Sequence, residues 1–246
     1  MSSNQFSENY LWHIFSFLLV SFGTLLFAGC NSSESPLEFD AGENPLGITF
    51  ADFNDDNKTD YIVASSRKQN GISTTEDGTL TLFQKNSSSS SRFPFTSSTI
   101  TPVAAEWRQD VISADFNGDN KSDLVVTHTG EDKIKLLRND GSANFTDNGS
   151  VTVGDVPINL ISGDWNNDNQ TDLAVVNRDN SSVSILQNSS GVFSVSQTLS
   201  VSVHPIQIAG GDWDSDNDTD LAVLLRDNTL VQIWLNGGTG TFSKQT

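Results

Sequence analysis

Four copies of a nine-residue acidic motif constrain the fold of this chain more than any other feature. Each copy reads Asp-[Phe/Trp]-[Asn/Asp]-x-Asp-Asn-x-[Ser/Thr]-Asp, and an apolar run follows at once. The copies are residues 52–60 (loop one), 115–123 (loop two), 164–172 (loop three) and 212–220 (loop four). Their first aspartates lie 63, 49 and 48 residues apart. Internal periods of this length are typical of propeller blades or solenoid units.

Oxygen-bearing side chains recur at positions 1, 3, 5 and 9 of every copy. Ca²⁺ prefers about six to eight oxygen ligands, and a backbone carbonyl at position 7 would add one more. The asparagine at position 6 tolerates the left-handed conformation that a sharp turn requires. A single loop of this kind would be explained as a solvated turn, but four copies in register favour calcium sites.

The predicted ligands are the residues at positions 1, 3, 5, 7 and 9, with position 7 contributing only its backbone carbonyl. They are Asp52, Asn54, Asp56, Lys58 and Asp60; Asp115, Asn117, Asp119, Lys121 and Asp123; Asp164, Asn166, Asp168, Gln170 and Asp172; and Asp212, Asp214, Asp216, Asp218 and Asp220.

These loops differ from the EF-hand, which needs a bidentate Glu at position 12 and flanking helices. Position 12 is valine in all four copies, inside apolar runs that indicate strands. Loop four has Asp214 where the others have Asn, and Lys58 and Lys121 occupy position 7 in loops one and two. Because ligand charge is one determinant of Ca²⁺ affinity, we expect loop four to bind most tightly, then loop three, then loops one and two.

The third repeat shows the strand pattern inside one unit. Residues 157–162, 173–176, 182–186 and 192–197 each favour a strand, with turn residues between them. Four short strands make one propeller blade, so the predicted fold class is all-β: a propeller of four four-stranded blades over residues 37–246, as a small ring or an open arc. A fragment of a larger ring is a further alternative. Each calcium loop would join the first and second strands of a blade. Residues 37–40 resemble a fourth strand and would complete the last blade.

The N-terminal region resembles a secretory signal. Residues 11–29 are largely apolar and end in Phe-Ala-Gly before Cys30, which is similar to the lipobox of bacterial lipoproteins. This resemblance implies a signal peptide over residues 1–29, a lipidated Cys30, a linker over residues 30–36 and an extracytoplasmic domain anchored in the cell envelope, with outer-membrane sorting. The alternative is an uncleaved signal anchor, because about 20 apolar residues can span a bilayer.

Composition excludes some partners and couples folding to metal. Acidic residues outnumber basic ones by 31 to 13, giving a net charge of −18 that opposes binding to nucleic acid or to anionic lipid. Many of these carboxylates lie in the four loops, where they repel one another until a cation neutralises them. The only cysteine is Cys30, so no intramolecular disulfide can form.

The four acidic loops and their apolar followers resemble the FG-GAP/VCBS repeat family, which is related to the integrin α-subunit propeller. Glycine-containing turns before Phe193 and Phe242 fit the same pattern. The resemblance covers about residues 37–246 and implies a β-propeller with Ca²⁺ between first and second strands. It carries the ligand role to Asp52, Asn54, Asp56 and Asp60, and likewise to the later copies.

The sequence favours a binding module over an enzyme. It contains no catalytic motif, and the calcium loops account for most paired carboxylates. The turns after the second and fourth strands would share one face, and they contain Trp107, Arg108, His204 and further cationic residues at positions 67, 68, 178 and 226. Exposed Trp and Arg are typical binding anchors. Trp107 could equally pack beneath its own loop, whereas Trp165 and Trp213 are predicted core residues.

The expected function is therefore recognition of a glycan or protein ligand at the cell surface. Two alternatives are an extracytoplasmic carbohydrate-active enzyme and a passive structural subunit of the envelope.

Overall fold

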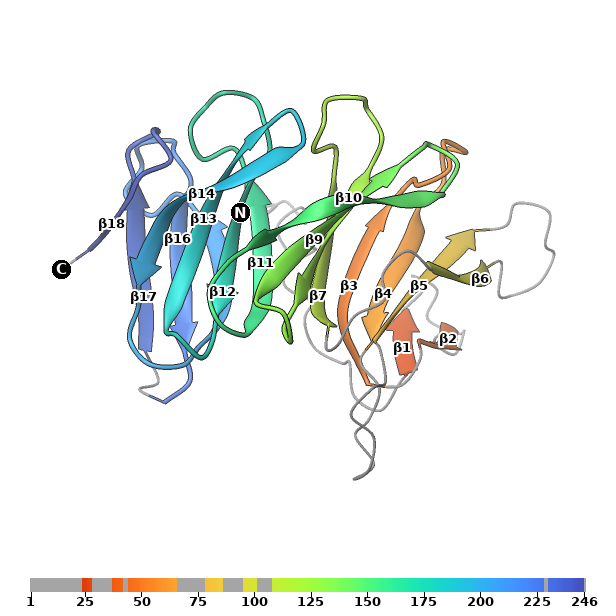
Figure 1. Cartoon of the computed structure of the whole chain (residues 1–246), viewed down its shortest axis with the longest axis horizontal. Helices are drawn as coiled ribbons and strands as arrows, with labels where there is room; N and C mark the ends of the chain where they lie inside the picture. The colour runs from red at the N-terminus through yellow and green to blue at the C-terminus, as the bar shows by residue number, and fades with distance from the viewer. Residues whose placement is uncertain are drawn as a thin grey trace, which may run out of the picture.

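The computed structural model describes residues 24–27, 37–41, 44–65, 78–85, 95–100, 108–227 and 230–245. All regular elements in these ranges are strands, which form four four-stranded sheets and one two-stranded sheet (Figure 1). Every pairing is antiparallel, and within each blade the strands are neighbours in chain order. Within the described part of the chain, no helix is long and apolar enough to cross a membrane. The all-β prediction with four four-stranded blades is confirmed.

The four blades repeat one strand order along the chain. Blade one contains β3 (Pro45–Ala51), β4 (Asp60–Ser65), β5 (Thr79–Lys85) and β6 (Phe95–Ile100); blade two contains β7 (Arg108–Ala114), β8 (Asp123–His128), β9 (Lys133–Asn139) and β10 (Phe145–Thr152). Blade three contains β11 (Pro157–Gly163), β12 (Asp172–Asn177), β13 (Ser182–Ser189) and β14 (Val192–Ser200); blade four contains β15 (Pro205–Gly211), β16 (Asp220–Leu225), β17 (Leu230–Asn236) and β18 (Phe242–Lys244).

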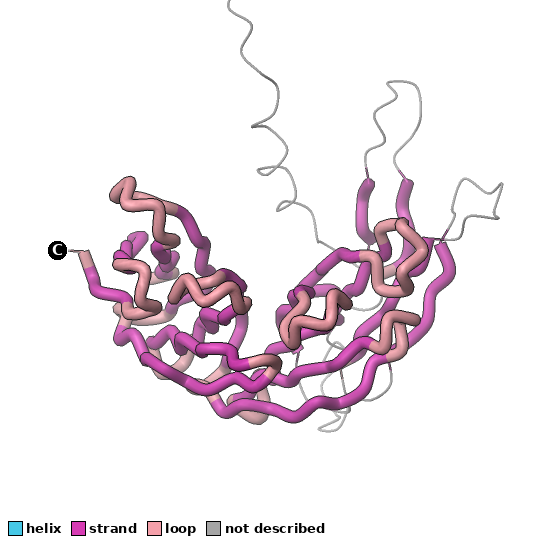
Figure 2. Tube along the Cα trace, turned by 90° about the horizontal axis from the view of Figure 1, so that it is seen from above, coloured by secondary structure: helices cyan, strands magenta, loops and turns pink. Residues whose placement is uncertain are grey.

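The blades stand along an open arc. The first strands β3, β7, β11 and β15 lie side by side in succession. Seen from above, the arc leaves blades one and four well apart (Figure 2). The structure therefore has the predicted open arc and not the small ring of four blades.

The core lies between blades, where each sheet packs on the next. Separate apolar clusters join blades one and two, two and three, and three and four. The second strands β8 and β12 are buried at every residue. This burial arises because they are covered by a neighbouring blade on each face, and it explains their continuous apolar sequence.

The prediction that the N-terminal segment completes blade four is wrong. β2 (Leu37–Asp40) pairs instead with β1 (Thr24–Phe27), and β18 already occupies the place beside β17. Ala41 is buried in a cluster with Val63 and Phe83 of blade one, and its carbonyl accepts a hydrogen bond from the Ser65 hydroxyl. Cys30, the linker after it and most of the predicted signal peptide lie outside the described residues.

Candidate metal sites

All four acidic loops join the first strand of a blade to its second strand, as predicted. Their turns use left-handed backbone at position 6, where φ is 62°, 62°, 64° and 73° for Asn57, Asn120, Asn169 and Asn217. Position 4 is left-handed as well, a feature that sequence reasoning missed; its residues are Asp55, Gly118, Asn167 and Ser215. Their small size and polarity was the available signal, because Gly, Asn and Asp tolerate this region best.

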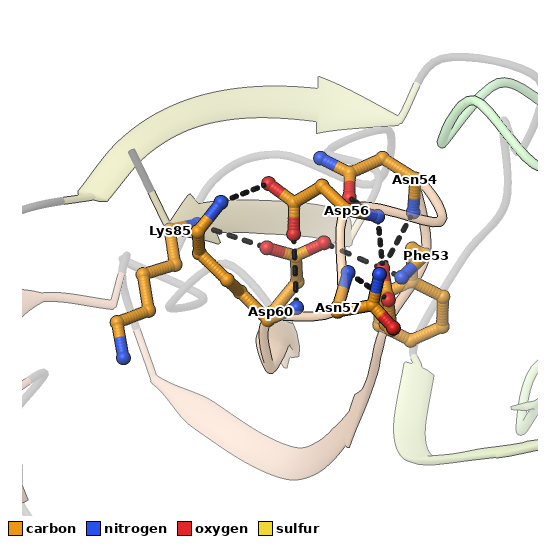
Figure 3. A network of polar contacts seen from close by, with 8 residues as sticks. Phe53, Asn54, Asp56, Asn57, Asp60 and Lys85 are labelled. Atoms are coloured by element: carbon orange, nitrogen blue, oxygen red, sulfur yellow. Dashed lines mark hydrogen bonds and ion pairs between the residues drawn. The ribbon is translucent and has the colours of Figure 1, made fainter. Parts of the chain in front are cut away.

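The backbone N–H groups of each loop hold its acidic side chains inside the turn. In loop one, the Asp52 carboxylate accepts hydrogen bonds from the backbone N of Asp56 (3.1 Å) and Asn57 (2.6 Å) (Figure 3). Asn54 Oδ1 accepts from the backbone N of Asp56, and Asp56 Oδ1 accepts from that of Lys58. Loops two and three repeat this network, and loop four retains the bonds to Asp212 and Asp216. Oxygens at positions 1, 3 and 5 are thus gathered on one turn.

The buried aspartate at position 9 is a candidate ligand and also joins its loop to the third strand by hydrogen bonds. Asp60 accepts one hydrogen bond from the backbone N of Phe53 and another from that of Lys85, which joins the loop to the third strand. Asp172 and Asp220 do the same within their blades, and Asp123 binds the backbone N of Asn139. Burial raises the pKa of Asp60, Asp123 and Asp172 against the opposing effect of these N–H donors. A carboxylate has about four lone-pair positions, so one remains on each oxygen for a cation.

Loop four fits a divalent cation best. Carboxylate oxygens of Asp212, Asp214 and Asp216 lie within 4.8 Å of one another. Desolvation, followed by the nearby charges of Asp216 and Asp220, raises the pKa of Asp214. Three acidic oxygens at this spacing are the donor set that hard cations such as Ca²⁺ prefer.

Loops one to three hold similar oxygens but pair some of them with side-chain donors. Lys58 Nζ lies 2.9 Å from Asp56 Oδ2 in loop one, and Asn117 Nδ2 lies 2.8 Å from Asp123 Oδ2 in loop two. In loop three, Asn166 Nδ2 and Gln170 Nε2 both donate to Asp168 Oδ2. A cation at these loops must displace such donors. The two asparagines can turn their side-chain amides so that the amide oxygen, and not the N–H donor, faces the cation.

The two tryptophans predicted to be core residues have different environments. Trp165 in loop three is 1% exposed and packs edge-to-face on Phe242 of blade four. Trp213 in loop four is 46% exposed, so its prediction is wrong. The reason is its place at the end of the arc, because in the described structure no following blade covers it.

A buried asparagine at the end of the third strand was not found from the sequence. Asn139, Asn188 and Asn236 each donate from Nδ2 to the backbone carbonyl of the loop aromatic residue in the preceding blade, at 2.9, 2.8 and 2.8 Å. Each also donates to its own loop and accepts from a glycine N–H in the next turn. The signal was an Asn at the same place before three successive turns; blade one has Lys85 there.

The predicted ligand-binding residues are only partly placed. Trp107 and the cationic residues at positions 67 and 68 lie outside the described residues, and only the backbone of Arg108 is described, at the start of β7. His204 is exposed and its Nδ1 pairs with Asp227, while Arg178 pairs with Asp179 at 2.7 Å. The hydrogen bond from Arg178 lowers the pKa of Asp179, and the charge of His204 when protonated lowers it further.

Comparison with protein families agrees with the repeats. A model described as FG-GAP-like repeat matches residues 52–126, 115–175 and 164–223, which together exceed half of the chain. The chain belongs to the FG-GAP-like repeat family. Comparison with curated proteins finds no match.

Several solved structures share the fold at low sequence identity. A protein of unknown function from Desulfotomaculum acetoxidans has a TM-score of 0.62 and 14% identity over 91% of this chain and 62% of its own. A Bacteroides fragilis protein provisionally named a 6-phosphogluconolactonase has a TM-score of 0.60 and 14% identity over 90% of this chain and 63% of its own. A Lactobacillus plantarum protein has a TM-score of 0.56 and 12% identity over 91% and 64%. This chain thus spans less than two thirds of each, and the likeness concerns the fold alone.

Proposed function

We propose that this chain is a calcium-binding propeller module that recognises a glycan or protein ligand at the cell surface. The observation that carries the calcium part is the convergence of Asp212, Asp214 and Asp216 in loop four. The repeated turn of loops one to three supports further sites of the same kind. Position 1, 3, 5 and 9 side chains and the position 7 carbonyl would hold the ion, which would neutralise carboxylates that otherwise repel one another.

Calcium would stabilise the folded arc because the native turn gathers the ligands and the unfolded chain disperses them. Binding to the native state alone raises stability by mass action. We therefore expect the melting temperature to rise with added Ca²⁺ and to fall with EGTA. Asp212→Ala should remove the tightest binding step in isothermal titration, whereas Asp147→Ala, which removes an exposed carboxylate outside the loops, should not. A melting temperature indifferent to EGTA would falsify the calcium proposal.

Ligand recognition is proposed for the surface that contains His204, Arg178 and their acidic partners. His204, Asp179 and Asp227 are exposed and Arg178 is partly exposed, and all four lie on turns that follow second or fourth strands. A glycan and protein capture screen with the full chain tests this role, with a His204→Ala/Arg178→Ala variant as the comparison. Retention that is equal for both proteins would contradict recognition at this surface. Release of new reducing ends from polysaccharides would instead support the enzyme alternative.

Anchoring through Cys30 is part of the same proposal and rests on the lipobox-like sequence before it. Several acyl chains on one residue would hold the domain stably at a membrane. Cys30→Ser should abolish labelling with radioactive palmitate and release the protein from the membrane fraction. Unchanged labelling and fractionation would favour the signal anchor.

A further inference from the structure

The three interfaces between consecutive blades use the same contacts. The aromatic ring at position 2 of loops one to three packs edge-to-face on a phenylalanine at the first or second residue of the fourth strand of the next blade. These pairs are Phe53 with Phe145, Phe116 with Phe193, and Trp165 with Phe242, with ring centroids 5.6, 5.5 and 6.0 Å apart. The buried asparagine described above then joins the next blade to the carbonyl of the same aromatic residue.

The inner strands add a second repeated contact. Asp110 Oδ2 in β7 accepts a hydrogen bond from the backbone N of Leu160 in β11, and Asn159 Oδ1 in β11 accepts one from the backbone N of Ile208 in β15. Both acceptors occupy the same place, five residues before the first aspartate of their loop. Blades two and three therefore each offer an acceptor that the next blade uses, whereas blade one has Gly47 at this place.

Blade four presents this interface without a partner among the described residues. Gln207, at the place of Asp110 and Asn159, is exposed. Val231 is 56% exposed, although its equivalents Leu80, Ile134 and Val183, which face the second strand in the same register, are fully buried. With Trp213, these residues form an uncovered face that we name the tail.

Blade one presents the opposite half of the interface. Ile48 in β3 is 36% exposed, whereas the equivalent Val111, Leu160 and Ile208 are 1%, 2% and 4% exposed because each packs on a preceding blade. Leu46 and Phe50 continue this stripe at 43% and 66% exposure. Ala41 covers the neighbouring Val63 and Phe83, so the free part, which we name the head, is the inner strand β3.

We propose that the tail of one copy docks on the head of a second copy, and that two arcs close into one ring of eight blades. The argument is continuity, because head and tail are the two halves of an interface that the chain already builds three times. A head-to-tail contact closes when its rotation completes a circle, and propellers of about eight blades are within the known range.

Charge complementarity supports the same pairing. The tail ends in loop four, which contains five aspartates. On blade one, the exposed Lys85 stands where blades two to four have the buried asparagine. The junction would therefore bring a cation towards an acidic loop.

Two single substitutions on exposed apolar residues test the proposal in the full chain, kept in detergent solution. Analytical ultracentrifugation should give twice the chain mass for the wild type. Ile48→Asp blocks the head and Val231→Asp blocks the tail, and each alone should sediment at the chain mass. Val192→Asp, which changes an exposed apolar residue on β14 away from both ends, should sediment like the wild type.

Mixing distinguishes this arrangement from others. An equimolar mixture of the two blocked variants should recover twice the chain mass, since each supplies the surface that the other lacks. The mixed pair should need higher protein concentration than the wild type, because one junction replaces two. Recovery also proves that both variants are folded. A wild type at the chain mass, an Ile48→Asp variant that still pairs, or a mixture that stays at the chain mass would each overturn the proposal.

Discussion

Loops three and four have the same motif and nearly the same internal hydrogen bonds, yet their surroundings differ. Blade four covers loop three: Gly240 lies so close that an added Cβ would touch Asn166, and Asn236 donates to the Trp165 carbonyl. Loop four has no such cover among the described residues, and its positions 1 to 6 are all exposed. The environment of a loop is thus set by the next blade and not by the motif itself.

This difference sets two determinants of calcium affinity against each other. Loop three is held more rigidly by its neighbour, while loop four has four acidic ligands and, within the described structure, no side-chain N–H donor on Asp212, Asp214 or Asp216. Rigidity and ligand charge both tune Ca²⁺ binding. Because a cation at loop three must also displace Asn166 and Gln170 from Asp168, we retain the expectation that loop four binds first.

The largest expected effect comes from the two tryptophans. Trp165→Ala should lower the free energy of unfolding by about 3–5 kcal/mol, since it leaves a cavity between blades three and four. Trp213→Ala should cost about 1 kcal/mol or less, because surface substitutions have small effects. Both are measured by urea denaturation in the Ile48→Asp background, which keeps the ends apart. Equal losses would show that loop four is covered in solution even there.

Asn236 provides a second comparison between a joined and a free end. Asn236→Ala should lower the free energy of unfolding by about 2–4 kcal/mol, because the buried Trp165 carbonyl loses its donor. Lys85→Ala changes the equivalent residue of blade one, whose backbone N–H to Asp60 is retained, and should be nearly neutral in the same background. A costly Lys85→Ala would indicate that its side chain holds blade one together.

The repeat made much of this fold predictable, and the ends account for most of the errors. Strand number, blade count and loop position follow from the motif, since a fixed period and apolar runs are local properties. The exposure of Trp213 is not local: it depends on whether another blade follows in space. The pairing of β2 with β1 is likewise a choice between distant partners that strand propensity cannot decide. The buried asparagine at the end of the third strand could be found in the sequence only by aligning the turns that follow the third strands.

Asp110, which joins blade two to blade three, should make the free energy of unfolding depend on pH. Burial raises its pKa to about 6 from an ordinary value near 3.8, although Leu160, Val111 and Asn159 donate hydrogen bonds to it. The folded chain therefore binds a proton that the unfolded chain has released, so stability should fall as pH rises between these two values, by about 2–3 kcal/mol.

The matched comparison uses amide variants. Asp110→Asn should remove this part of the pH dependence, at the cost of one hydrogen bond to the backbone of Val111 or Leu160. Asp155→Asn, which changes an exposed side chain, should retain it. Urea denaturation at steps between pH 4 and 7 measures both, and parallel curves for Asp110→Asn and wild type would contradict the assignment to Asp110.

The smallest expected effect is on calcium affinity at loop one and comes from the Lys58 side chain. Lys58 Nζ contacts Asp56 Oδ2 at 2.9 Å and holds the pKa of that carboxyl below its usual value. Replacing it by Gln should free this oxygen and tighten binding at loop one roughly threefold, because exposed ion pairs are weak. The gain should shrink with added salt, since screening already weakens the pair.

Lys121→Gln in loop two is the control: the Lys121 stem lies over Gly141, so a smaller gain is expected. Calcium titrations of both variants at two salt concentrations decide the point, and equal gains would mean that net charge and not the Lys58–Asp56 contact sets the difference.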